Sequence, residues 1–281
     1  MHRLALAVLA AFLFLASGAT AAPTAVPKRI VSLSPTATET LFAIGAGKQV
    51  VAVDDQSDYP KRAPRTKLSG FTPNVEAIAE YRPDLVVIAY DPGELRSSLR
   101  RLHIRVVLQD AAKTLPEAYA QIEQLGSLTG HRKQAHALTT RMKKQIRKLV
   151  AHSRRHGAGL TYYHELTPDL YSATSRTFVG RVYALFGLKN IADAADRTGS
   201  GYPQLSPEYV VSAAPDLIVL ADTVCCGQTP RAVAARPGWS RIPAVRNGLI
   251  LRIDDSIASR WGPRIVKFVR AVDAALSHVR R

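Results

Sequence analysis

One stretch of this sequence occurs twice in outline, at residues 73–88 and 205–220. In both copies a glutamate opens a short helix of periodic apolar residues, and seven residues later a Pro-Asp pair leads into a strand of apolar residues only. The two glutamates, Glu76 and Glu208, lie 132 residues apart (208 − 76). A repeat of that length is a duplicated lobe rather than a solenoid unit. The sequence therefore predicts two similar α/β halves, with a ligand site between them as the leading hypothesis.

The amino terminus has the pattern of an export signal. A short basic start is followed by an apolar run from Leu4 to Ala16 and by the small residues Ala19-Thr20-Ala21. The run of 13 residues (16 − 4 + 1) suits the core of a signal peptide and is too short to span a bilayer. We predict a signal peptide at residues 1–21. No cysteine follows it to receive a lipid, so we expect a periplasmic or otherwise extracytoplasmic protein that is soluble once the signal is removed.

The formal net charge of +16 is the outlier in an ordinary globular composition. Such a charge suits nucleic acid, an anionic ligand or an anionic envelope surface, and export argues against nucleic acid. Nine basic residues and no acid lie at residues 131–156, which contain no Gly or Pro and carry a helical apolar stripe. A helix of that length spans about 39 Å, enough to join two lobes. Its charge is either a solvated outer face or a contact with an anionic membrane or partner.

Strands and helices alternate on both sides of this linking helix. That alternation predicts parallel sheets with both faces covered, and hence an α/β fold. We place a first lobe at residues 28–130, the linking helix at 131–156 and a second lobe at 157–281. The expected strands are 29–33, 50–53, 85–88 and 106–108 in the first lobe, and 160–163, 217–220 and 249–253 in the second.

The familiar signatures of catalysis are missing. Gly199-Ser200-Gly201 lacks the spacing of a nucleophile elbow, and Gly45-Ala46-Gly47 lacks the third glycine of a dinucleotide turn. His164-Glu165 opens like a zinc-protease helix, but Pro168 stands where the second histidine is required. We therefore predict no catalytic residues, no metal ligands and no resident cofactor. An exported α/β enzyme with a similar cleft is the alternative.

Ligands of open α/β sheets bind beyond the carboxyl ends of the strands, so the two lobes should line a shared cleft. Aromatic side chains dominate the residues expected there, which suits a large flat ligand. The alternative for each residue is a place in the core beside a loop. The candidates are Pro35, Gln56 and Phe71 in the first lobe, and His164, Tyr171, Tyr202, Ser259, Arg260, Trp261 and the Cys225-Cys226-Gly227 loop in the second.

The two cysteines of the chain, Cys225 and Cys226, are adjacent. No Cys or His stands at a metal-ligand spacing from them. An oxidising compartment permits a disulfide between the neighbours, and two reduced thiols in a loop are the alternative.

The repeated glutamates have two interpretations. Glu76 and Glu208 each begin a helix, where a carboxylate interacts favourably with the helix dipole, so a capping role accounts for either one alone. Their matched positions would also present two carboxylates on one rim. A partner with paired arginines could dock there in a defined register.

Taken together, these motifs resemble the periplasmic binding proteins of the cobalamin and iron-siderophore class, which deliver a ligand to an ABC importer. The likeness extends over the mature chain, and as a set its motifs are specific for the class. They are Arg29–Pro35 with Thr38-Glu39, the Ser57–Pro60 turn, the Glu76–Asp84 block, the long linking helix, and Tyr202–Glu208.

The resemblance implies two Rossmann-like lobes with central parallel sheets, joined by a single long rigid helix, with modest closure on binding and no chemistry on the ligand. It implies that Glu76 and Glu208 face arginines of the permease, so the expected partners are an ABC permease dimer and its ATPase, with this chain a monomer. The pattern is nearest to that of the cobalamin receptors. Their corrin-contacting positions fall on Pro35, Phe71, Tyr171 and Tyr202.

The chain departs from the cobalamin-receptor pattern at several positions. Gln56 replaces an aromatic contact and Ser259 an acidic one, and the loop at residues 225–228 and the segment 259–264 are not part of that pattern. Arg260 and Trp261 suit an anionic or aromatic group. The hypothesis is therefore a corrinoid-binding protein, with a ferric siderophore or haem as the alternative ligand.

Overall fold

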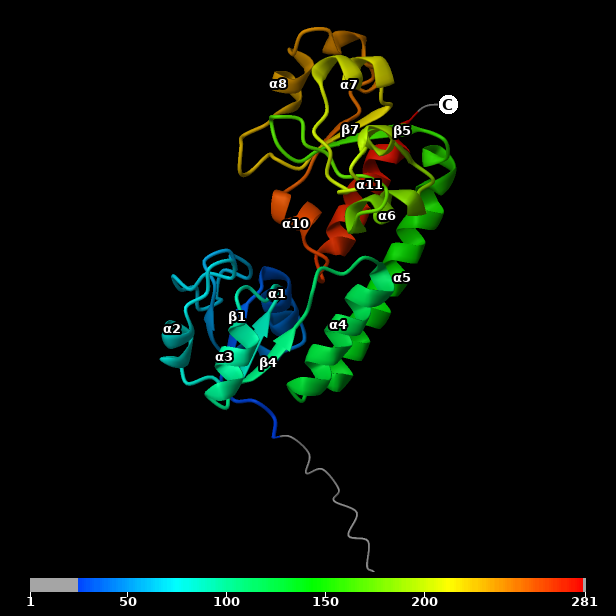
Figure 1. Ribbon diagram of the computed structural model, residues 1–281. Coiled ribbons are helices and arrows are strands. Elements are labelled where there is room, and N and C mark those ends of the chain that lie inside the picture. Colours follow the sequence, from blue (N-terminus) through cyan, green and yellow to red (C-terminus); the bar gives the residue numbers. More distant parts are fainter. Residues whose placement is uncertain (1–24, 280–281) are drawn as a thin grey trace, which may run out of the picture.

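The computed structural model describes residues 25–279, so the predicted signal peptide at residues 1–21 lies outside the described residues. Two four-stranded parallel sheets form the cores of two lobes (Figure 1). The strand orders are β2-β1-β3-β4 and β6-β5-β7-β8, so the second lobe repeats the arrangement of the first and the predicted fold class is confirmed. The strands are β1 (Ile30–Leu33), β2 (Val50–Val53), β3 (Leu85–Ile88), β4 (Arg105–Leu108), β5 (Thr161–Glu165), β6 (Lys189–Asn190), β7 (Leu217–Leu220) and β8 (Ile250–Arg252).

The sequence repeat is also a structural repeat. Helices α2 (Val75–Ala79) and α7 (Pro207–Ala213) begin 132 residues apart (207 − 75). Each begins after a polar cap, Asn74 or Ser206, whose side chain accepts a hydrogen bond from the backbone N–H three residues later. Such caps satisfy N–H groups that have no partner inside the helix.

The Pro-Asp pair of each copy ties two neighbouring strands together at their amino ends. Asp84 accepts hydrogen bonds from the backbone N–H groups of Lys28 and Arg29, both at 2.8 Å, just before β1. Asp216 accepts from the backbone N–H of Thr161 at 2.8 Å and from its hydroxyl at 3.0 Å, where β5 begins. The repeated Asp therefore sets where the strand after it meets the first strand of its sheet.

The linking helix α5 (Arg132–Gly157) runs along one side of both lobes (Figure 1). It lies beside α4 (Leu115–Leu128), and its far half packs on α11 (Ile265–Ser277) of the second lobe. The predicted stripe faces inward, and its Met142 and Ile146 belong to a core that includes residues of both lobes. That shared core makes the helix part of each lobe rather than a free linker.

The close approach of α4 and α5 depends on Gly126. A Cβ added at Gly126 would collide with the Cβ of Ala135 on α5.

The remaining elements are α1 (Pro35–Ala43), α3 (Leu95–Arg101), α6 (Phe178–Leu185), α8 (Pro230–Ala234), α9 (Pro243–Arg246), α10 (Asp255–Ser259), and the short 3-10 turns at Ala46–Gln49, Ile191–Ala195 and Trp239–Arg241.

Several strand ends shift by one residue from the prediction, and two strands differ by more than that. Strand β5 continues through His164 and Glu165, whereas the apolar pattern predicted an end at residue 163. Strand β6 has two polar residues, Lys189 and Asn190, and no apolar alternation that would have indicated it. Within residues 25–279, no helix combines the length and apolar character needed to cross a membrane.

Candidate ligand-binding cleft

Large hydrophobic side chains are exposed in the segments that follow the strands of both sheets. Phe71, Tyr171 and Tyr202, all predicted from the sequence, are 73%, 42% and 54% exposed. Apolar side chains gathered at one edge of a protein mark an interaction site, and this edge is where α/β sheets bind ligands. The full set is Tyr59 and Phe71 after β2, Tyr90 after β3, Tyr171 after β5, Tyr202 after β6 and Val224 after β7.

A cavity of about 410 Å³ lies at the edge of the second lobe, beside the segment that leads into α4. This volume is within the range of small-molecule sites. The predicted residues Tyr202, Ser259 and Trp261 line it, together with the cationic side chains of Lys113 and Arg176. Aromatic and cationic groups in one cavity suit a flat ligand that also carries negative charge.

Trp261 is held in this cavity from the first lobe's side. Its indole Nε1–H donates a hydrogen bond of 2.7 Å to Oε1 of Gln121 on α4. A Trp whose polar edge is satisfied in this way can turn the rest of its ring to a ligand.

Arg260 bridges the two lobes. Its guanidinium donates to carboxylate oxygens of Glu39 and Asp58, at 2.9 Å each, and to the backbone carbonyl of Gln56 at 3.0 Å. All three acceptors belong to the first lobe, and the Arg260 side chain is 13% exposed. The charge of Arg260 is thus already met by two carboxylates of the first lobe, and its contact with an anionic or aromatic group of the ligand stays a prediction. The residue joins the two lobes because its acceptors meet it there, and it places the backbone of Gln56, whose own side chain is exposed.

Glu39 and Asp58, whose carboxylates both accept from Arg260, differ in exposure. Glu39 is buried, whereas the Asp58 side chain is 42% exposed. Desolvation alone would raise the pKa of Asp58, but its hydrogen bond to Arg260 and the charge of Arg260 hold that pKa below its ordinary value. Asp58 therefore stays ionised at the lobe boundary.

His164 is fully buried, and its predicted contact with ligand does not fit this position. Its Nδ1 lies 2.7 Å from the hydroxyl of Tyr183, and burial lowers the pKa of the imidazole to about 4. The prediction failed because β5 continues past residue 163, which keeps His164 inside the sheet. A neutral histidine in the core is the result.

A buried ionic network lies next to His164, and no sequence motif indicated it. Glu165 accepts two hydrogen bonds from Arg236, at 2.6 and 2.7 Å, and the Arg236 guanidinium stacks on Trp239 at 4.6 Å. Asp222 is buried beside them, and burial, reinforced by the charge of Glu165, raises its pKa to about 7. Glu165 meets Arg236 from 71 residues away along the chain, so no local pattern could show the network.

The remaining candidates lie at the ends of helices. Pro35 is the half-buried first residue of α1. Ser259 is exposed at the end of α10, and its hydroxyl donates to the backbone carbonyl of Asp255 at 2.6 Å. Ser259 also lines the cavity, so its position, unlike that of His164, is open to a ligand.

Glu76 and Glu208 are exposed at matched places, each the second residue of its helix. Asn74 and Ser206 provide the side-chain caps of α2 and α7, so the glutamates are not the capping groups. Within residues 25–279, neither glutamate carboxylate forms a hydrogen bond or an ion pair. Both are therefore available to a partner.

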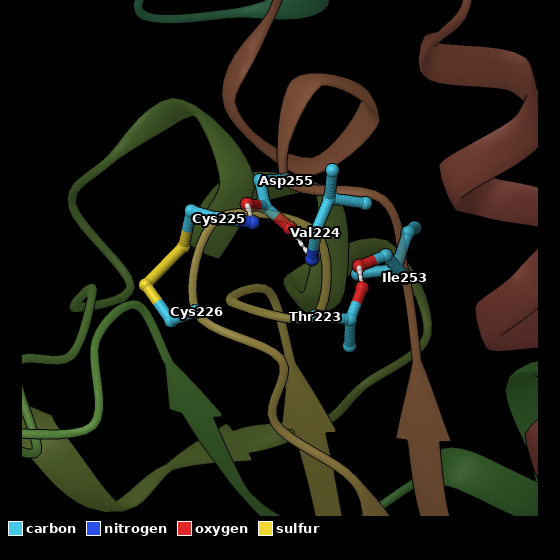
Figure 2. The surroundings of a disulfide bond; sticks show 6 residues. All are labelled: Thr223, Val224, Cys225, Cys226, Ile253 and Asp255. Carbon is cyan, nitrogen blue, oxygen red and sulfur yellow. Dashed lines mark hydrogen bonds between the residues drawn. A yellow bond between two sulfur atoms is a disulfide. The ribbon is translucent and has the colours of Figure 1, made fainter.

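Cys225 and Cys226 are joined to one another in a disulfide, the first of the two states considered. The pair lies in the loop after β7, beyond the carboxyl end of the strand (Figure 2).

Comparison with known proteins decides the family. Residues 30–257 match a family model described as periplasmic binding protein. The chain belongs to this periplasmic binding protein family. It is 32% identical over 253 residues to an uncharacterized ABC transporter substrate-binding lipoprotein, YvrC, of Bacillus subtilis, covering 86% of this chain and 78% of the relative. It is 29% identical over 266 residues to the vitamin B12-binding protein of Pectobacterium atrosepticum, covering 91% of each chain.

The two-lobed fold of this periplasmic binding protein agrees with solved structures. The periplasmic heme-binding protein RhuT from Roseiflexus is 25% identical, with a TM-score of 0.75, covering 89% of this chain and 97% of RhuT. The family consists of binding proteins, which sets aside the alternative of an exported enzyme. This protein is the substrate-binding component of an ABC importer, works with a permease and an ATPase, and acts outside the cytoplasm.

Proposed function

We propose that this periplasmic binding protein captures a corrinoid between its lobes and delivers it to the permease of its importer. The observation that carries the proposal is the set of exposed aromatic side chains at the carboxyl ends of both sheets. Phe71 and Tyr90 come from the first lobe, Tyr171 and Tyr202 from the second. Aromatic rings contributed by both lobes suit a broad ring system with apolar faces. The vitamin B12-binding relative supports the same ligand.

The interlobe contacts favour modest closure around this ligand. Arg260 already bridges the lobes through Glu39 and Asp58, and the core of α5 is continuous with both. A large hinge rotation would break these contacts. The ligand would therefore enter a cleft that is largely formed beforehand, which lowers the ordering cost of binding.

Haem or a ferric siderophore is the second candidate, for a specific reason. The cavity lined by Tyr202 and Trp261 also contains the cationic side chains of Lys113 and Arg176. Haem carries carboxylates that the Lys113 ammonium would pair with, whereas Arg176 already donates to a carboxylate oxygen of Asp196 at 2.6 Å. Phenol oxygens such as those of Tyr171 and Tyr202 are suitable ligands for ferric iron. The heme-binding RhuT is similar to this chain over most of its length.

Docking on the permease would use Glu76 and Glu208. Their carboxylates are exposed, are not used as caps, and occupy equivalent places on the two lobes. A permease dimer with one set of arginines on each subunit would meet one glutamate from each lobe. Paired charges of this kind set register and orientation more than raw affinity.

Thermal denaturation of the purified mature protein with cyanocobalamin, haemin and representative ferric siderophores tests the proposal. A ligand at about a thousand times its Kd stabilises the folded protein by roughly 4 kcal/mol, which gives a clear rise in Tm. A rise with cyanocobalamin alone supports the corrinoid, and a rise with haemin or a siderophore alone supports the second candidate. The absence of a shift with every ligand would sink both.

A pair of variants locates the ligand within the cleft. Tyr202→Ala and Tyr171→Ala should weaken binding, since each removes an exposed aromatic face at the strand ends. Leu102→Ala is the matched control, because Leu102 is a similarly exposed apolar residue (51%) that follows α3 rather than a strand. Equal losses in all three variants would place the ligand elsewhere.

A further inference from the structure

The loop that follows β7 ends in an unusually apolar tip. Val224 is 71% exposed, and Cys225 and Cys226 beside it are exposed as well. Turns at a protein surface are ordinarily made of polar residues and glycine. Here a valine and a soft, polarisable disulfide occupy the tip, on the sheet edge that also carries Tyr171 and Tyr202.

The structure holds this tip in place from one side. The carboxylate of Asp255 accepts hydrogen bonds from the backbone N–H groups of Val224 at 3.0 Å and Cys225 at 2.7 Å. The hydroxyl of Thr223 donates to the carbonyl of Ile253 at 2.8 Å (Figure 2). The two residues that precede the disulfide bond are therefore fixed to the β8–α10 turn, Thr223 through its side chain and Val224 through its backbone, and the Val224 side chain stays exposed.

The other end of the loop is also tied down. The backbone N–H of Gln228 donates to the carbonyl of Asp222 at 3.3 Å, which closes the loop on itself. The side-chain amide oxygen of Gln228 accepts from Arg236 at 3.1 Å. Between these ties, Gly227 adopts a φ of +67° with open space around it. The segment from 225 to 227 is the part whose shape rests on the disulfide.

The loop is adjacent to the cavity already described. Asp255, which holds the tip, begins α10 (Asp255–Ser259). Ala258 and Ser259 at the other end of this one short helix line the cavity, and so does Trp261. The tip, the helix and the cavity are thus parts of one surface of the second lobe.

We infer that Val224 and the Cys225–Cys226 disulfide form a ligand-contacting tip of the second lobe, whose shape and affinity for the ligand depend on the bond between the two sulfurs. The inference rests on the proposed function, since it extends the same cleft. An apolar tip that is rigid before the ligand arrives adds contact without an ordering cost. The soft sulfurs pack well against a ring face.

Reduction should undo this arrangement. A dithiol reductant supplies two electrons and two protons, so the S–S bond breaks, two thiols form and the reductant closes to its own disulfide. The 225–226 peptide is then released from its small ring. The anchored residues Thr223 and Val224 stay in place, and the tip beyond them loses its fixed shape.

The first experiment compares ligand affinity among variants without any reductant, which would itself act on cobalt or iron. The wild type, Val224→Ala and the double variant Cys225→Ser/Cys226→Ser are titrated with cyanocobalamin and with haemin, and Leu102→Ala serves as the control. For the ligand that the wild type binds, we expect Kd to rise about tenfold in both tip variants, mostly through faster dissociation. The Leu102→Ala variant should bind like the wild type.

The alternative is a disulfide that only braces the fold. It predicts a lower Tm of the ligand-free double variant with an unchanged Kd, and that result overturns the inference while leaving the proposed function intact. Unchanged Kd values in both tip variants overturn it too. If the wild type binds neither cyanocobalamin nor haemin, the proposals of a corrinoid and of haem as the ligand both fail, and the inference fails with them.

A second measurement needs no variant and therefore survives a double variant that does not fold. Excess dithiothreitol is added to the wild-type protein with and without saturating cyanocobalamin or haemin, whichever binds. Samples are alkylated at intervals, and alkylated Cys225 and Cys226 are counted by mass spectrometry, so that neither the thiols of the reductant nor its consumption by the metal of the ligand enters the count. A ligand that covers the tip should slow reduction of Cys225–Cys226 several-fold. Equal rates would show that the bound ligand does not reach the disulfide and would overturn the inference.

Discussion

Arg264 of the second lobe and Glu39 of the first form a two-point ion pair. Nε of Arg264 lies 2.9 Å from Oε2 of Glu39, and Nη2 of Arg264 lies 2.6 Å from Oε1. The Arg264 side chain is 10% exposed and the Glu39 side chain 1% exposed. Arg260 donates to the same carboxylate, so one buried anion serves two cations. The ring of Tyr59 lies 4.4 Å from the Arg264 guanidinium and covers it. Glu39 is therefore the acceptor that both arginines share at the contact between the lobes.

Replacing that glutamate should loosen the contact between the lobes. Glu39→Gln leaves Arg260 and Arg264 without their shared counter-ion, and removal of one partner from a buried pair costs about 3–5 kcal/mol. Urea denaturation should show a lower midpoint. Glu80→Gln, an exposed glutamate outside every ion pair of residues 25–279, is the control. A midpoint equal to that of the control would mean that the interlobe pair contributes no stability.

Stability should also respond to the titration of His164. Its folded-state pKa of about 4 is below the ordinary 6.5, so between these values the unfolded chain binds more protons and stability falls as the pH falls. Relative to His164→Gln, the wild type should lose about 2 kcal/mol of unfolding free energy between pH 7 and pH 5. Denaturant titrations of both proteins at the two pH values measure it. A constant difference would contradict the burial of a neutral imidazole.

Asp222 should produce a pH dependence of the opposite sign. Its pKa is raised to about 7 by burial and by the charge of Glu165, so the folded state holds the proton more tightly than the unfolded chain. The stability from this group is complete below its ordinary pKa and is lost as the pH rises through about 7. Asp222→Asn should therefore gain stability relative to the wild type between pH 5 and pH 8. Parallel denaturation curves across that range would argue for an ionised Asp222.

Reversing the two repeated glutamates separates docking from binding. Glu76→Arg/Glu208→Arg should abolish uptake in vesicles that contain the permease and its ATPase, since like charges would oppose each other at the docking surface. Ligand affinity should stay at the wild-type value. Glu80→Arg, at the end of α2, is the matched charge reversal and should support uptake. If the double variant loses ligand binding, the glutamates belong to the cleft or to the fold instead.

The elements predicted well are those whose signals are local. Each repeat copy carries its own cap, periodic helix and Pro-Asp turn within 16 residues (88 − 73 + 1), and the structure places α2–β3 and α7–β7 there. The end of β5 was missed because His164 and Glu165 are polar, and only the tertiary surroundings show that a neutral imidazole and an Arg-paired carboxylate are buried.

The part of the site that escaped prediction depends on distant partners. Arg260 was predicted to face the ligand, but it meets Glu39, which is 221 residues away in the sequence. One sequence shows that both residues are charged and says nothing of their pairing. The exposed aromatics Phe71 and Tyr171 were predictable because each follows an expected strand. Tyr202 follows β6, which no apolar pattern indicated, so strand order alone did not place it.

Asp84 and Asp216 lie at the amino edge of their sheets, opposite the edge that carries the aromatic residues. The two aspartates that align the strands thus lie apart from the residues proposed to meet the ligand. Loops at the carboxyl edge can be exchanged or lengthened without disturbing the alignment of the strands below them. A framework divided in this way can be adapted to new cargo, by evolution or by grafting loops from a related receptor, while both lobes keep their strand register.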